Sequence, residues 1–238
     1  CLLEVLNREA PSWPPGTEPE EILRTLRILI IHAGGDSRRL PAYGPCGKIF
    51  VPVPGESESA HGRTLFDRLS PAFLNMPSGA PGAGQLLVTS GDALILFDAS
   101  GLDFGQPGLT ALGCYAPAAE AALHGVFQAG SDGPIRRYHQ KPSIARQREL
   151  DLWNESGEAI LDVGVMNFDA AASAALLRAF PIEKDQNGRL AWTAGTRADM
   201  LERGVDLYRE ICCAMGSEAT LEHYLDSARS SGTPWSDA

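Results

Sequence analysis

The stretch R-I-L-I-I-H-A-G-G-D-S-R-R-L-P, residues 27–41, decides the fold that the sequence predicts. Its first six residues centre on a short apolar run with β-branched side chains, which is typical of a buried strand in a parallel sheet. Gly34 and Gly35 follow almost at once, and glycines at such a turn let backbone N–H groups approach a phosphate. The stretch therefore predicts a strand whose following loop can receive an anionic ligand.

Segments of strand and helix character alternate along the rest of the chain, and no internal repeat interrupts them. Extended segments are predicted at residues 49–53, 85–89, 109–115, 126–128, 134–140 and 159–168. Helices are predicted at residues 17–26 with Thr17 as N-cap, 64–75 with a kink or break at Pro71, 142–150, 170–180 and, as an amphipathic segment, 205–215. This alternation predicts an α/β sheet with helices on both faces. Ligands of such sheets bind beyond the C-terminal strand ends, which selects the loops after Ile31, after Thr89 and around Lys141.

Composition narrows the class of protein. With 238 residues, 44% hydrophobic and 21% charged, the chain can build a globular core. Its formal net charge of −10 argues against a nucleic-acid or anionic-membrane partner, and no apolar run approaches the ~20 residues of a membrane span. The five cysteines include no C-x-x-C pair, which argues against a disulfide framework or zinc site. We therefore expect a cytoplasmic location, no nucleic-acid partner and no membrane partner.

The loop after the first strand is locally basic in this acidic chain. Residues 36–48 hold three cations and one anion, a local charge of +2 that suits a nucleoside triphosphate. The segment contains neither G-x-x-x-x-G-K-[ST] nor G-x-G-x-x-G, which argues against a P-loop enzyme and a dinucleotide oxidoreductase. The glycine pair alone fits an ordinary strand-to-helix turn with surface arginines equally well.

The full string is more specific, because it resembles the sugar-nucleotide pyrophosphorylase signature A-G-G-x-G-x-R-L-x-P with a lysine further on. Two positions depart from it, namely Ser37 in place of the third glycine and Gly47 in place of a proline. With these departures, H-A-G-G-D-S-R-R-L-P and G-K-I-F resemble the guanylyltransferase part of the bifunctional fucokinase / L-fucose-1-phosphate guanylyltransferase family. The family's further motifs occur in the same order: S-G-D at 90–92, H-G-V-F at 124–127, Q-K-P-S at 140–143, L-D-V-G-V at 161–165 and D-L-Y-R-E at 206–210.

The resemblance implies a Rossmann-like three-layer α/β nucleotidyltransferase fold with a mostly parallel mixed sheet, of the nucleotide-diphospho-sugar transferase type. The resemblance covers residues 27–216, so we expect these residues to form the nucleotidyltransferase domain. Residues 1–26 would form an N-terminal loop and helix before it. Residues 217–238 would form a tail or the start of a missing C-terminal region. Family members are much longer and carry a β-helix and a kinase domain that this sequence lacks. We therefore expect a fragment of a longer protein, or otherwise a homo-oligomer.

The implied reaction is Mg²⁺-dependent nucleotidyl transfer from GTP to L-fucose 1-phosphate, giving GDP-L-fucose and pyrophosphate. The implied catalytic residues are Arg39, Lys48 and Asp92. The implied nucleotide-binding residues are Ala33, Gly34, Gly35, Asp36, Ser37, Arg38, Ser90 and Gly91. The implied sugar-binding residues are His124, Gly125, Lys141, Asp162 and Gly164. The implied Mg²⁺ ligands are Asp92 and Glu210.

These residue types suit the roles, because both reactants are polyanions and catalysis is charge neutralisation and alignment. A carboxylate such as Asp92 suits Mg²⁺, which favours one or two carboxylates together with substrate phosphates. The residues also allow plainer roles: Asp92 and Asp162 as local caps, Arg38, Lys141 and Glu210 as solvated side chains, and His124 as a structural histidine. Two other functions stay open, a pyrophosphorylase for another sugar 1-phosphate or nucleoside triphosphate, and a non-catalytic sugar-nucleotide-binding module.

Overall fold

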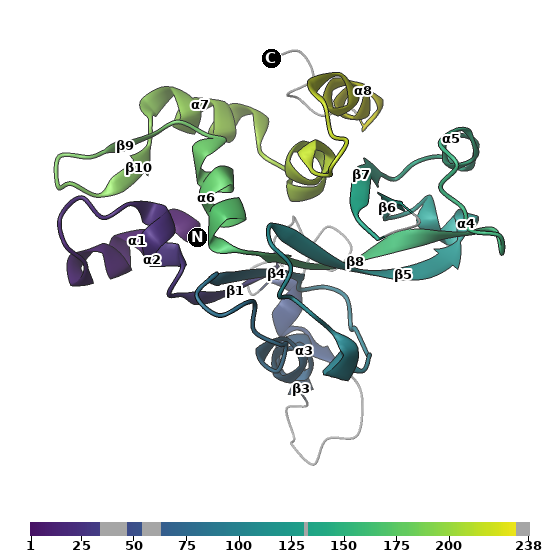
Figure 1. The fold of residues 1–238 in the computed structure, drawn as a ribbon, viewed down its shortest axis with the longest axis horizontal. Coiled ribbons are helices and arrows are strands. Elements are labelled where there is room, and N and C mark those ends of the chain that lie inside the picture. Colours follow the sequence, from purple (N-terminus) through teal and green to yellow (C-terminus); the bar gives the residue numbers. More distant parts are fainter. Residues whose placement is uncertain (34–46, 54–62, 131–132, 232–238) are drawn as a thin grey trace. The chain divides into compact units, whose positions relative to one another are not determined.

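The structure is a computed structural model that describes residues 1–33, 47–53, 63–130 and 133–231 (Figure 1). The chain divides into two compact units. Unit 1 comprises Cys1–Ala111 and Gly164–Ala191, and unit 2 comprises Leu112–Val163 and Trp192–Ala238. Each unit is described by itself.

The sheet of unit 1 is built on two parallel strands, β1 (Arg27–His32) and β4 (Gln85–Ser90). They are in register from Arg27 opposite Gln85 to His32 opposite Ser90, so both C-terminal ends lie at the same edge. The second half of β8 (Glu158–Phe168) pairs with β4 in the antiparallel direction. β4 and the second half of β8 are largely buried and the inner residues of β1 are partly buried, which explains the apolar runs in their sequences.

The helices of unit 1 are α1 (Leu2–Glu9), α2 (Pro19–Leu23), α3 (Leu65–Leu74) and α6 (Ala170–Arg178), and α2 packs against α6. Two small hairpins join β2 (Pro52–Val53) to β3 (Arg63–Thr64), and β9 (Ile182–Lys184) to β10 (Leu190–Trp192), whose last residue belongs to unit 2. Thr64 and Asp67 form a capping box at the start of α3, which then runs through Pro71 without a break.

In unit 2 the strand β6 (Gly125–Ala129) lies between β7 (Ile135–Gln140) and the first half of β8 and is antiparallel to both. β5 (Leu109–Pro117) also pairs with β8. The helices are α4 (Ala118–Ala121), α5 (Ile144–Glu149), α7 (Ala194–Arg203) and α8 (Leu221–Ser231), with a π-helical turn at Leu207–Ile211 and a 3-10 turn at Cys212–Ala214. Val126, Phe127, Tyr138 and Ala159 are buried in its core.

The predicted α/β class with a mixed sheet is confirmed, and it is consistent with a Rossmann-like nucleotidyltransferase fold. The sheet is less parallel than predicted, since β1–β4 is parallel but β4–β8, β6–β8 and β6–β7 are antiparallel. The β6–β7 connection is too short for a crossover and can only reverse the chain. The predicted domain boundaries at 26/27 and 216/217 stay predictions.

Several local predictions were wrong. Thr17 does not cap a helix, because its hydroxyl donates to the carbonyl oxygen of Pro14 at 2.8 Å and α2 begins two residues later with Glu18 as N-cap. Residues 49–53 are not one strand, since Lys48–Phe50 is a 3-10 turn that precedes the short β2. The amphipathic segment 205–215 folds as the π-helical and 3-10 turns rather than as an α-helix. The sequence reading did not predict α1, α7 or α8.

A glycine pair in the loop before β4 offers a stability test. Gly84 and Gly82 both have positive φ, +67° and +73°, but only at Gly84 would a Cβ meet another atom, 2.2 Å from the carbonyl oxygen of Leu23 in α2. Gly84→Ala should therefore lower the free energy of unfolding by about 3 kcal/mol, and Gly82→Ala by about 1 kcal/mol. Urea denaturation measures both, and equal losses would contradict the close approach of this loop to α2.

Candidate functional site

The predicted site residues fall into three sets. Gly34, Gly35, Asp36, Ser37, Arg38 and Arg39 lie outside the described residues. Lys48 begins the 3-10 turn Lys48–Phe50, and its side chain is not described. Most of the others lie in unit 1 at the ends of β1 and β4, or in unit 2 around β6, β7 and β8. Gly164 belongs to unit 1 and has a φ of +74° within β8, and Glu210 lies in the π-helical turn of unit 2.

In unit 1 the two predicted nucleotide-binding segments meet at the C-terminal edge of β1 and β4. The N–H of Gly91 donates to the carbonyl oxygen of His32 at 3.0 Å. A Cβ on Gly91 would lie 3.1 Å from both that oxygen and the Cβ of Ala33, so a side chain would crowd this junction. The start of the glycine loop and the S-G-D motif, 57 residues apart at Ala33 and Ser90, are thus neighbours in space.

Asp92 presents an exposed carboxylate directly after this junction. Its Oδ1 accepts a hydrogen bond from the Ser90 hydroxyl at 2.9 Å, which orients the carboxylate relative to the end of β4. Across the described residues no three His, Cys, Asp or Glu side chains gather as a metal cage. Mg²⁺ needs no such cage, because it commonly binds one or two carboxylates together with substrate phosphates. The oriented hard oxygen of Asp92 fits that kind of site.

In unit 2 a buried tyrosine joins three of the predicted motifs. The hydroxyl of Tyr138 lies 3.1 Å from Oδ2 of the buried Asp162 and 3.2 Å from Oε1 of Gln140. A Cβ on Gly125 would lie 1.8 Å from the same hydroxyl oxygen, so glycine is what leaves room for the tyrosine. We call Gly125, Tyr138, Gln140 and Asp162 the Tyr138 cluster.

Burial keeps the Tyr138 hydroxyl and two neighbouring cysteine thiols protonated. Burial, followed by the charge of Asp162, raises the pKa of Tyr138 far above its ordinary value, so its hydroxyl is a permanent donor. Burial likewise raises the pKa of the nearby Cys212 thiol and raises that of Cys213 to about 11. Both cysteines are therefore neutral thiols at physiological pH rather than reactive thiolates.

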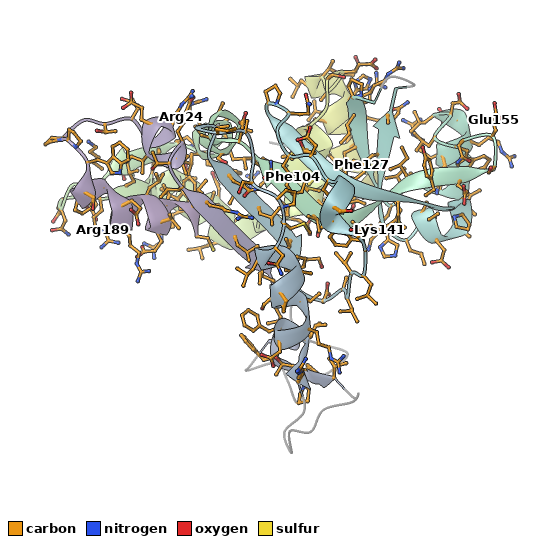
Figure 2. All side chains as sticks on the ribbon, turned by 60° about the horizontal axis from the view of Figure 1, so that its bottom comes forward. Arg24, Phe104, Phe127, Lys141, Glu155 and Arg189 are labelled. Carbon is orange, nitrogen blue, oxygen red and sulfur yellow. The ribbon has the colours of Figure 1, made fainter. Side chains whose placement is uncertain are left out.

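Lys141, labelled in Figure 2, lies between β7 and α5. Its backbone conformation is unusual. Its φ is +51°, in the left-handed region, and its N–H donates to the carbonyl oxygen of His124 at 3.0 Å. Two residues after Lys141, the hydroxyl of Ser143 accepts a hydrogen bond from the N–H of Arg146 and so caps the start of α5. The predicted sugar contacts His124, Gly125 and Lys141 thus lie together at one end of β6 and β7, with both His124 and Lys141 exposed.

Glu210 has a local structural contact. Its buried carboxylate accepts the N–H of Asp206 at 2.5 Å, and Asp206 in turn caps the π-helical turn by accepting the N–H groups of Tyr208 and Arg209. Burial raises the pKa of Glu210. The carboxylate therefore has a capping role, and its role as a metal ligand stays a prediction.

The sequence reading missed Tyr138 as a member of the site. The only sequence signal for Tyr138 is the alternation of side chains along I-R-R-Y-H-Q. This alternation places Tyr138 on the face of β7 opposite that of Arg137 and His139. The partner Asp162 lies 24 residues away along the chain, and only the pairing of β6 with both β7 and β8 brings the two together.

Removal of the tyrosine hydroxyl should weaken the fold. Tyr138→Phe takes a donor from the buried Asp162, and we expect the free energy of unfolding to fall by about 1–3 kcal/mol. Tyr115→Phe is the matched control, because Tyr115 is 62% exposed and should change stability by less than about 0.5 kcal/mol. Denaturant titrations compare the two, and a Tyr138→Phe chain as stable as the control would show that the hydroxyl contributes nothing.

Comparison with known proteins relates this arrangement to one family. The sequence model of the fucose pyrophosphorylase domain matches residues 20–235. An L-fucokinase/L-fucose-1-P guanylyltransferase of Bacteroides fragilis is 28% identical over 226 residues, 93% of this chain and 22% of the relative. A fucose-1-phosphate guanylyltransferase of Mus musculus is 34% identical over 159 residues, 56% of this chain and 25% of the relative.

A bifunctional fucokinase/GDP-fucose pyrophosphorylase of Arabidopsis thaliana is 25% identical over 152 residues, which make up 59% of this chain and 14% of the relative. The matched region thus spans a quarter or less of each of these three proteins. In the part of this chain that the structure describes, no helix is both long and apolar enough to cross a membrane.

Proposed function

The chain belongs to the fucose pyrophosphorylase domain family, and from that premise we propose that it transfers a guanylyl group from GTP to L-fucose 1-phosphate. The products would be GDP-L-fucose and pyrophosphate. The observation that carries the proposal is the junction of Ala33 with Ser90, Gly91 and Asp92 at the C-terminal edge of the parallel pair β1 and β4. Ligands of α/β sheets bind at such edges.

In this reaction a phosphate oxygen of L-fucose 1-phosphate attacks the α-phosphorus of GTP in line. The bond from that phosphorus to the bridging oxygen of the β-phosphate breaks, and pyrophosphate leaves with the electron pair. No covalent enzyme intermediate is required, so the residues act by neutralising charge and aligning the reactants. Arg39 would bind the leaving pyrophosphate through its planar fork, and Lys48 would bind at the α-phosphate or the sugar phosphate.

Asp92 would hold Mg²⁺, which when bound neutralises phosphate charge and helps to orient the triphosphate. The Ser90 hydroxyl supports this role, because its hydrogen bond limits the positions open to the carboxylate. We propose Glu210 only as a second Mg²⁺ ligand. In that role its carboxylate would release the N–H of Asp206, which it accepts in this structure.

On the sugar side, Lys141 would contact the sugar 1-phosphate and Asp162 would accept hydrogen bonds from sugar hydroxyls. Tyr138 would act as a positioning residue, since its hydroxyl donates to Asp162 and its ring fills the space above Gly125. His124 and Gly164 complete the proposed sugar contacts. The proposal also includes a cytoplasmic location and a longer native protein with further domains. The second part is supported by the matched region making up only 22% and 14% of two relatives.

Pyrophosphate release from GTP in the presence of L-fucose 1-phosphate tests the proposal on the 238-residue chain. We expect turnover with Mg²⁺ and none when EDTA removes it. Turnover that persists in EDTA would contradict the Mg²⁺ dependence. Binding of GDP-L-fucose without turnover at saturating Mg²⁺ would instead identify a non-catalytic sugar-nucleotide-binding module.

A further inference from the structure

A single buried glutamine of α5 connects two separate segments of unit 2. The side chain of Gln147 is fully buried. Its Nε2 donates to the carbonyl oxygen of Ala118 and to that of Pro142, both at 3.0 Å. Its Oε1 accepts the indole N–H of Trp153 at 2.9 Å. We call the three hydrogen bonds that join Gln147 to Ala118, Pro142 and Trp153 the Gln147 clamp.

The partners of the Gln147 amide fix its orientation. A carbonyl oxygen can only accept a hydrogen bond and an indole N–H can only donate one, so the opposite orientation of the amide would satisfy none of the three groups. Both amide hydrogens of Gln147 are used. Loss of the amide would leave buried polar groups unpaired, which is costly. We therefore expect the clamp to be a rigid part of unit 2.

One bond of the clamp holds the segment that leads to His124. Ala118 is the first residue of α4, which is the single turn Ala118–Ala121. The N–H of His124 donates to the carbonyl oxygen of Ala121 at 3.1 Å, so His124 follows this turn directly. A shift of Ala118 would therefore displace His124 as well.

The other bond holds the segment that carries Lys141. Pro142 directly follows Lys141, whose backbone is in the left-handed region. The N–H of Lys141 donates to the carbonyl oxygen of His124 at 3.0 Å. Lys141 and Pro142 also line a cavity of about 410 Å³ in unit 2. The segments of His124 and Lys141 are thus joined twice, by this backbone hydrogen bond and, in the interior, by the amide of Gln147.

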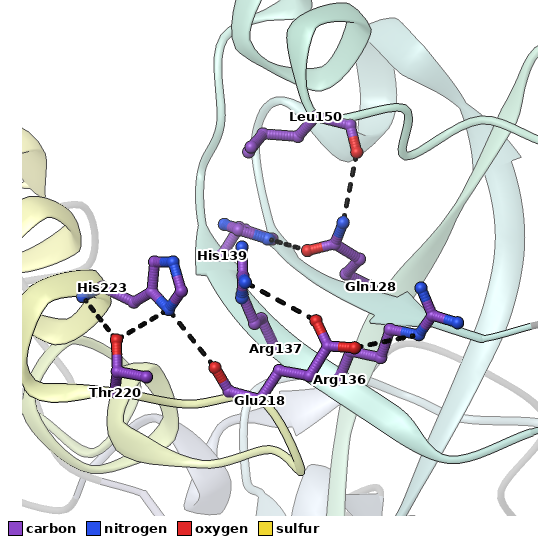
Figure 3. Close-up of polar contacts among 8 residues, drawn as sticks. All are labelled: Gln128, Arg136, Arg137, His139, Leu150, Glu218, Thr220 and His223. Atoms are coloured by element: carbon purple, nitrogen blue, oxygen red, sulfur yellow. Dashed lines mark hydrogen bonds and ion pairs between the residues drawn. The ribbon is translucent and has the colours of Figure 1, made fainter.

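The C-terminal end of α5 is held by a different glutamine. Nε2 of Gln128 donates to the carbonyl oxygen of Leu150 at 3.2 Å, and its Oε1 lies 3.0 Å from Nε2 of His139 (Figure 3). Loss of the Gln147 amide would leave these contacts in place. We therefore expect such a loss to loosen the segment around Lys141 without releasing the whole of α5.

We propose that Gln147 is a positioning residue for the sugar 1-phosphate. Its side chain is fully buried and does not reach the ligand, but it holds the segments of His124 and Lys141 at a fixed separation. This inference rests on the proposed function, in which Lys141 contacts the sugar 1-phosphate. Misplacement of such a contact by about 1 Å can cost ~100-fold in rate, so a buried hydrogen bond can govern turnover.

Steady-state kinetics of Gln147→Met test this on the 238-residue chain. Methionine is a flexible side chain of similar length, but it removes both amide donors. We expect the KM for L-fucose 1-phosphate to rise at least ~tenfold. The KM for GTP should stay within about twofold, because the proposed nucleotide contacts lie elsewhere in the chain. A merely structural role would lower the fraction of active protein, and hence kcat, without this selective rise in KM.

Trp153→Phe is the matched control. It removes the indole donor to Oε1 of Gln147 but keeps both hydrogen bonds from Nε2. Its KM for L-fucose 1-phosphate should therefore stay within about twofold of that of the unaltered chain. Equal rises of this KM in the two variants would overturn the proposal, and so would equal rises for both substrates in Gln147→Met.

Hydrogen exchange tests the clamp independently of turnover. In the unaltered chain the side-chain NH₂ of Gln147 should exchange far more slowly than that of the exposed Gln106. The backbone N–H of Lys141 should lose at least ~tenfold of its protection in Gln147→Met and keep it in Trp153→Phe. Fast exchange of the Gln147 NH₂ would overturn the proposal even if Gln147→Met does not fold, and so would unchanged protection of Lys141 in a folded Gln147→Met chain.

The two experiments separate this proposal from the proposed function. Absence of turnover in the unaltered chain would contradict guanylyl transfer, and the exchange of Gln147 and Lys141 would then decide the clamp alone. Normal turnover with an unchanged KM for L-fucose 1-phosphate in Gln147→Met would leave guanylyl transfer standing and contradict the positioning role.

Discussion

Asp92→Asn should lower kcat for guanylyl transfer at least ~100-fold while leaving the fold intact. The amide keeps the size of the side chain and an oxygen that can accept from the Ser90 hydroxyl. It loses the negative charge, which is what a carboxylate contributes to a Mg²⁺ site shared with phosphates. Pyrophosphate release at saturating GTP and L-fucose 1-phosphate measures the loss.

Asp98→Asn is the matched control for this variant. Asp98 belongs to the same exposed segment and accepts the N–H of Ser100 at 2.9 Å, a contact that asparagine preserves. Its turnover should stay within twofold of the unaltered chain. If Asp92→Asn turns over as fast as Asp98→Asn, Asp92 does not hold the metal.

Lys141 should prove to be both a strained and a functional residue. Lys141→Ala and Lys141→Gly both remove the ammonium group, and each should lower turnover about 100-fold if that charge contacts the sugar 1-phosphate. Their stabilities should differ, because φ is +51° at this position and glycine adopts that conformation without strain. We expect the glycine variant to be about 1 kcal/mol more stable than the alanine variant in urea denaturation.

The same pair of variants separates the two effects. Equal turnover with unequal stability assigns the function to the ammonium group and the strain to the backbone. Lys184→Ala in β9 provides the control for loss of a lysine, and its turnover should not change. Full turnover in Lys141→Gly would remove Lys141 from the proposed site.

The strands were the most predictable part of the fold. The runs at 85–89 and 159–168 are apolar because β4 and much of β8 are buried, and the apolar run at 27–32 forms β1, whose inner residues are partly buried. An apolar run does not indicate whether a strand lies parallel or antiparallel to its neighbour. The predicted proportion of parallel pairs was therefore too high. The helix α1 escaped prediction although Leu2, Leu3 and Leu6 have helical spacing, because one apolar stripe in eight residues is a weak signal.

The candidate site likewise has residues that the sequence could predict and residues that it could not. Sequence motifs predicted Asp92, Gly125, Lys141 and Asp162 because short runs around them are distinctive, and the structure places Gly125 and Asp162 in one cluster. Tyr138 carries no motif of its own, and its role arises from tertiary contacts with residues of β6 and β8.

The most direct test of the central claim is initial-rate pyrophosphate release across a matrix of nucleoside triphosphates and sugar 1-phosphates. The matrix pairs GTP, ATP and UTP with L-fucose, D-mannose and D-glucose 1-phosphates, all at saturating Mg²⁺. The account predicts the highest kcat/KM for GTP with L-fucose 1-phosphate. A higher kcat/KM for UTP, or for glucose 1-phosphate, would contradict it.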